Sequence, residues 1–92
     1  LQINSPHVRE LAEVFATRIS GKADGNLQVI VTRAFSHALN REPTESERTA
    51  AVGFIEAQQA EYERTGESNA PGKAVADFAQ AILALNEFIS VE

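Results

Sequence analysis

Cysteine is absent from the 92-residue sequence, and its absence excludes several kinds of site at once. The segment forms no disulfide bond, holds no metal through thiolates and attaches no haem through a Cys-x-x-Cys-His motif. Long apolar runs are also missing, because the longest stretch without a formally charged residue covers only residues 78–86. That stretch is far shorter than the roughly 20 residues that cross a bilayer. We therefore expect a soluble segment without membrane insertion, and any export signal upstream of it.

Basic residues are few, with 8 Lys and Arg against 13 Asp and Glu and a net charge of -5. The excess of acid lies in the second half of the chain, where residues 43–92 contain 3 basic and 9 acidic side chains. Such a chain repels the phosphate backbone of nucleic acids. A helix-turn-helix geometry around Pro43 is conceivable, but its second helix would begin with Glu45 and Glu47. We therefore expect no nucleic-acid partner.

Internal repeats, low-complexity tracts and sustained apolar/polar alternation are all missing, whereas helical spacing of apolar residues recurs four times. The pattern predicts one all-α domain over residues 1–92, a compact four-helix bundle with helices at about 6–20, 27–39, 44–64 and 73–88. The β-branched residues 29–31 would also allow a strand, but helical spacing continues beyond them. The fourth helix is apolar almost all round, which is typical of a helix covered on two sides.

The apolar stripes name the residues expected in the core. They are Val8, Leu11, Ala12, Phe15 and Ile19 in the first helix; Leu27, Ile30, Val31, Ala34, Phe35 and Ala38 in the second; Ala51, Phe54, Ile55, Gln58 and Tyr62 in the third; and Val75, Phe78, Ala79, Ile82, Leu85 and Ile89 in the fourth.

Helix boundaries are marked by capping residues and turn formers. Asn4 or Ser5 can cap the first helix, and Gly21 is expected to end it in the left-handed conformation. Asn40 can take the same conformation after the second helix. Thr44 and Glu47 have the spacing of a capping box, in which each side chain bonds to the backbone N–H of the other. Residues 65–72 are expected to form the longest loop.

Reactive groups are sparse and badly spaced for catalysis. His7 and His37 are too few for a conventional zinc site, and Ser36 points about 100° away from His37 around a helix. Glu56, Glu61, Glu63 and Glu67 form a solvated acidic face more readily than an acid–base pair, which needs one carboxyl in a dry pocket. No Gly-rich phosphate loop is present. We expect neither a catalytic residue nor a bound cofactor or metal in this segment.

Three segments together resemble a known family. They are residues 1–8 (LQINSPHV), residues 38–44 (ALNREPT) followed by Glu47, and residues 83–89 (LALNEFI). They are similar to the C-terminal part of the planctomycete-specific PSD domain, a domain of unknown function. The similarity spans nearly the whole chain, and its motif residues here are Arg41, Pro43, Thr44, Glu47, Asn86, Glu87 and Phe88. In two places the chain departs from the family, with Asn40 where the family often has glycine and Ala84 where it often has asparagine.

The resemblance implies a C-terminal fragment of a large exported protein, periplasmic or at the cell surface, often with a cytochrome-c-like segment upstream. It implies no activity for the segment itself. On physical grounds, the Arg41 guanidinium could hold the carboxylate of Glu47 or Glu87 and so tie the middle turn to the chain end. The alternative is that Arg41 faces outward and grips an acidic ligand or another domain.

Two function hypotheses remain open from the sequence. The first is a non-catalytic interaction or packing module that docks on upstream domains of the same polypeptide through Leu1, Ile3, Phe88 and Ile89. The second is an accessory part of an enzyme or redox protein that lends one wall to a site formed upstream. A pocket joining His7, Arg41 and Glu87 would favour the second hypothesis. A minor third is a protein-binding surface on the acidic third helix.

Overall fold

The computed structural model describes the backbone of residues 6–90 and the side chains of residues 7–86. It contains four helices, α1 Pro6–Ser20, α2 Leu27–Leu39, α3 Glu45–Arg64 and α4 Ala70–Ser90. No strand occurs among residues 6–90, so the prediction of an all-α four-helix bundle is confirmed. Residues 29–31 lie within α2, and a strand there is excluded.

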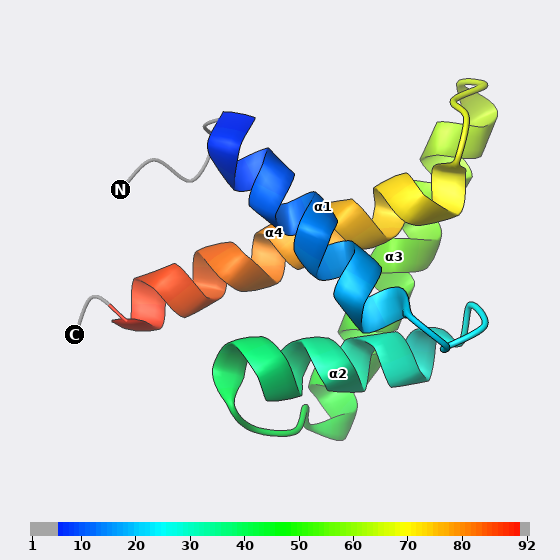
Figure 1. Ribbon diagram of the computed structural model, residues 1–92. Coiled ribbons are helices and arrows are strands. Elements are labelled where there is room, and N and C mark those ends of the chain that lie inside the picture. The colour runs from blue at the N-terminus through cyan, green and yellow to red at the C-terminus, as the bar shows by residue number, and fades with distance from the viewer. Residues whose placement is uncertain (1–5, 91–92) are drawn as a thin grey trace.

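Helix α4 is the centre of the bundle, and each of the other three helices packs against it. Figure 1 shows α1 crossing in front of α4 and α2 lying below these two helices, while α3 runs behind α2 and α4. Within the described part of the chain, the backbones of α1 and α3 do not lie close to each other, and the two helices meet only through side chains beside α4. The prediction that the fourth helix is nearly enclosed therefore holds for residues 70–82, where Val75, Phe78 and Ile82 are buried.

The core is built from a few large aliphatic side chains and many alanines. Ile19, Val31 and Ile55 are its largest fully buried side chains. Burial of each stabilises the fold by about 1.5–3 kcal/mol. Alanines line both sides of the α1–α4 contact, because Ala12 and Ala16 of α1 are buried, as are several alanines of α4. Small side chains allow the two backbones to approach closely.

Three apolar residues predicted for the core lie at the surface instead. Leu11 is 50% exposed, Phe54 41% and Leu85 44%. Because α1 crosses α4 instead of lying along it, only a narrow arc of α1 is covered (Figure 1). Ala16, which the stripe omitted, occupies that arc, and Leu11 lies outside it.

The capping box is confirmed at the start of α3. The N–H of Glu47 donates to Thr44 Oγ1 at 3.1 Å, and the N–H of Thr44 donates to Glu47 Oε1 at 2.8 Å. Asn40 ends α2 in the left-handed conformation, as predicted. The residues proposed to cap α1, Asn4 and Ser5, lie outside the described residues.

Two boundary predictions are wrong. The left-handed residue after α1 is Lys22, with a φ of 61°, and not Gly21. Arg33 of α2 donates to the carbonyl oxygens of Ile19 and Gly21, so a side chain satisfies the end of α1. Helix α4 begins at Ala70, three residues earlier than about 73, because Asn69 Oδ1 accepts the N–H of Gly72. Pro71 fits that first turn, where no N–H is needed. The loop expected over residues 65–72 therefore covers only 65–69, and the connection over 21–26 is longer.

Candidate functional site

The turn between α2 and α3 holds the motif residue Arg41 against Glu47. Two parallel hydrogen bonds of 2.8 Å join Arg41 Nη1 and Nη2 to Glu47 Oε1 and Oε2. The guanidinium also lies 5.4 Å from the ring centroid of Phe35. Pro43, a residue of the same turn, is buried. The same Glu47 carboxylate closes the capping box, so one side chain serves both the helix start and the ion pair.

This ion pair lies at the surface and not in the core. The Arg41 side chain is 47% exposed and that of Glu47 is 36% exposed. The hydrogen bond from Arg41, followed by the one from the Thr44 backbone, lowers the pKa of Glu47 to about 2. Water screens such an exposed pair, so its contribution to folding is small. The pair orders the turn without forming a dry, reactive site.

Asn86, a motif residue of α4, is hydrogen-bonded to the end of α2. Its side-chain amide Nδ2 donates to the carbonyl oxygen of Ala38, at the end of α2. The turn and the end of α4 are therefore connected through Asn86. The contact proposed between Arg41 and Glu87 lies outside the described side chains, as do Phe88 and Ile89. Leu1 and Ile3 lie outside the described residues altogether.

A polar network around Asp77 joins α1, α3 and α4, and the sequence patterns did not single it out. Asp77 accepts hydrogen bonds from Arg9 Nη1 at 2.9 Å, Gln58 Nε2 at 2.7 Å and the Tyr62 hydroxyl at 2.8 Å. Its side chain is only 16% exposed. The hydrogen bond to Asp77, and then burial, raise the pKa of Tyr62. The signal in the sequence is a lone carboxylate in the middle of an apolar helix.

The Asp77 network is arranged for structure more than for chemistry. Both carboxylate oxygens are engaged by donors from neighbouring helices, and Arg9 also donates to Gln80 Oε1 at 3.0 Å. A general base needs an oxygen directed at a bound substrate. The three donors instead hold α1 and α3 at a fixed position on α4.

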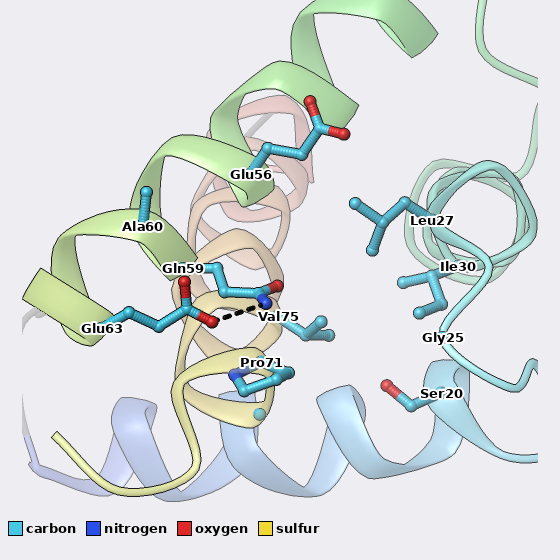
Figure 2. Close-up of a pocket in the computed structure, with 11 residues that line it drawn as sticks. Ser20, Gly25, Leu27, Ile30, Glu56, Gln59, Ala60, Glu63, Pro71 and Val75 are labelled. Atoms are coloured by element: carbon cyan, nitrogen blue, oxygen red, sulfur yellow. Dashed lines mark hydrogen bonds between the residues drawn. The ribbon is translucent and has the colours of Figure 1, made fainter.

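An open groove of about 600 Å³ lies between α2, α3 and the start of α4. Figure 2 shows Leu27 and Ile30 pointing into the hollow from α2, while Val75 and Pro71 point into it from α4. The α3 wall consists of Glu56, Gln59, Ala60 and Glu63. Two of the acidic residues singled out in the sequence thus share one groove. Glu61 pairs instead with Arg64, and Glu67 with Lys73 at 2.7 Å.

A second groove, of about 520 Å³, runs between α1 and the start of α4. Arg9, Glu13 and Lys73 are its charged lining residues. Neither His7 nor Arg41 lines this groove or the first one. Glu87, the third residue of the pocket expected for an accessory role, lies outside the described side chains.

The remaining candidates for chemistry are dispersed. His7, Ser36 and His37 are exposed on α1 and α2. Within residues 7–86, no three His, Asp or Glu side chains gather closely enough to hold a metal ion. None of the helices, over the part of the chain that is described, is long and apolar enough to cross a membrane.

Comparison of the chain with protein-family models, curated proteins and solved structures finds no match. The resemblance to the PSD domain therefore rests on the three sequence segments alone.

Proposed function

We propose that the chain is a non-catalytic helical interaction module that packs against other domains of its own polypeptide. The observation that carries the proposal is an exposed apolar pair on α1. Leu11 is 50% exposed and Val14 is 64% exposed. The two residues are three positions apart, so they share one face of the helix. Two exposed apolar side chains on one helix face offer a partner a small apolar contact surface.

The pair lies on the side of α1 that α4 does not cover. Ala12, Ala16 and Ile19 take the covered side and are buried in the core. Burial of Leu11 and Val14 by a partner would remove apolar surface from water without disturbing the contacts that hold the bundle together. The proposed surface thus differs from the chain-end residues expected from the sequence, which lie outside the described side chains.

The family resemblance supports an intramolecular partner. A segment that resembles the C-terminal part of a domain in large exported proteins has upstream domains as its first available contact. The proposal therefore includes an exported parent protein. An accessory role beside a reactive site upstream is less well supported, because His7 and Arg41 line neither groove.

The proposal is tested by producing the upstream portion of the parent protein separately and titrating it with residues 1–92. We expect saturable binding with a negative heat-capacity change, the sign of apolar burial. Absence of binding at high micromolar concentrations of both partners would contradict docking.

A further inference from the structure

We infer that the groove between α2, α3 and the start of α4 is a binding site for a basic amphipathic helix. This surface is separate from the exposed face of α1, and the inference goes beyond docking within the polypeptide. Its partner is a helical segment that carries apolar side chains between two Lys or Arg residues seven positions apart.

The floor of the groove supplies apolar contacts for such a helix. Ile30 and Val75 are core residues with only 2% and 6% of their surface exposed, so they close the floor. The accessible apolar surface comes from half-buried Leu27 of α2 and exposed Pro71 of α4. Figure 2 shows these side chains converging on the hollow from α2 and α4. A volume of about 600 Å³ accommodates several side chains at once. An inserted Leu or Phe would therefore meet apolar atoms on two sides.

The α3 wall sets the length and spacing of the partner. Its four lining residues, Glu56, Gln59, Ala60 and Glu63, stand at i, i+3, i+4 and i+7 and therefore lie on one face of the helix. Glu56 and Glu63 are separated by about 10.5 Å along the axis, which is two helical turns. Ala60 between them is small, so a second helix can lie close to α3. This is the geometry of a helix bound in a groove.

Charge complementarity determines the polar face of the partner. Glu56 and Glu63 are exposed at the rim, and none of the described residues that line the groove is Lys or Arg. Glu63 accepts one hydrogen bond, of 3.1 Å, from Gln59 Nε2. Arg33 does not line the groove, and its guanidinium donates to the carbonyl oxygens of Ile19 and Gly21, on either side of the lining residue Ser20. The rim therefore attracts cations and repels an acidic segment.

The test uses residues 1–92 and a synthetic helical peptide of about 14 residues, long enough to retain partial helicity. The peptide has Lys at i and i+7, Leu at i+3 and i+4, and Ala or Gln elsewhere, and binding is followed by fluorescence anisotropy. We expect saturable binding that weakens as salt is raised. Replacing both Lys by Glu, or placing Pro at the centre, is expected to abolish it.

Protein variants locate the site. The double variant Glu56→Gln/Glu63→Gln is expected to weaken binding about three- to tenfold, as loss of two partly exposed charge pairs implies. Ala60→Trp is expected to block the groove and weaken binding at least as much. The matched control Glu45→Gln/Glu61→Gln removes the same charge from the same helix outside the groove, and its affinity is expected to stay near that of the wild type.

Three results would overturn the inference. They are absence of peptide binding, equal weakening by the groove and control double variants, or undiminished binding of the proline peptide. Because Leu11 and Val14 lie outside the groove, Leu11→Gln/Val14→Gln is expected to bind the peptide normally. Failure of docking through α1 and failure of the groove are thus measured separately.

Discussion

Asn86 near the end of α4 donates a side-chain hydrogen bond to the carbonyl oxygen of Ala38, the residue before the last of α2. The two residues are 48 positions apart in the chain, and both are partly buried. The bond satisfies a carbonyl near the helix end, where no intrahelical partner remains. It also connects the last helix to the turn that contains Arg41 and Glu47.

We predict that Asn86→Ala lowers the free energy of unfolding by about 1 kcal/mol, because one partly buried hydrogen bond is lost and the Ala38 carbonyl loses its partner. Urea denaturation followed by circular dichroism measures the change. Gln28→Ala, at an exposed position of α2, is the control and is expected to have little effect. Equal stability of Asn86→Ala and wild type would show that the bond contributes nothing.

Asp77→Asn is predicted to destabilise the fold by about 2 kcal/mol. The replacement keeps the shape of the side chain, but it removes the charge facing Arg9 and directs an amide donor toward Gln58 or Tyr62. Thermal unfolding of the two proteins gives the difference. Asp24→Asn is the matched control, since Asp24 is exposed and has a left-handed φ of 52° that Asn also adopts. A similar effect of both substitutions would argue against the network.

Thr44→Ala is predicted to cost about 1 kcal/mol, because the N–H of Glu47 at the start of α3 loses its side-chain acceptor. Thr44→Ser keeps the hydroxyl and is expected to retain most of the stability. Chemical denaturation of the three proteins separates the cap from other effects of the side chain. If the serine variant were as unstable as the alanine variant, the hydroxyl would not be the cause.

The stability of the Arg41–Glu47 turn is predicted to fall in acid. The pKa of Glu47 is lowered to about 2 in the folded protein, from an ordinary value of 4.5. A carboxyl whose pKa is depressed by folding stabilises the protein above its unfolded pKa, and that contribution is lost as the pH falls toward the folded value. The relevant window is therefore pH 4.5 down to about 2.

Glu47→Gln isolates this effect, because Gln can still accept the N–H of Thr44 in the capping box but carries no charge. We expect wild type to be more stable than the variant at neutral pH and the gap to close across that window. Denaturation midpoints measured at several pH values test it. A gap that stays constant into strong acid would contradict the ionic contribution of Glu47.

The positions of the helices could be predicted from local sequence signals, but the way in which the helices pack against one another could not. The capping box at Thr44 and the left-handed Asn40 depend on neighbouring residues, so sequence spacing was sufficient to find them. The exposure of Leu11 depends on the way α1 crosses α4, which no spacing within α1 encodes. Position within a stripe indicates a face of the helix, but not how much of that face a partner helix covers.

For the candidate surfaces, too, the sequence indicated single residues but not the contacts between helices. Glu56 and Glu63 could be recognised as acidic residues of α3, but their place beside the apolar floor at Ile30 and Val75 required the packing of three elements. Asp77 was visible as a charge in an apolar helix. Its donors come from α1 and α3, up to 68 positions away. Contacts of that range depend on how the helices assemble and not on sequence periodicity.

Binding of the upstream portion of the proposed parent protein to wild type and two surface variants tests the central claim most directly. Leu11→Gln/Val14→Gln removes the exposed apolar pair of α1, whereas Phe54→Gln removes an exposed apolar residue of α3. With circular dichroism showing all three proteins folded, isothermal titration calorimetry is expected to give wild-type affinity for Phe54→Gln and at least tenfold weaker binding for the α1 variant. Equal affinity of all three proteins, or no binding by any of them, would contradict docking through α1.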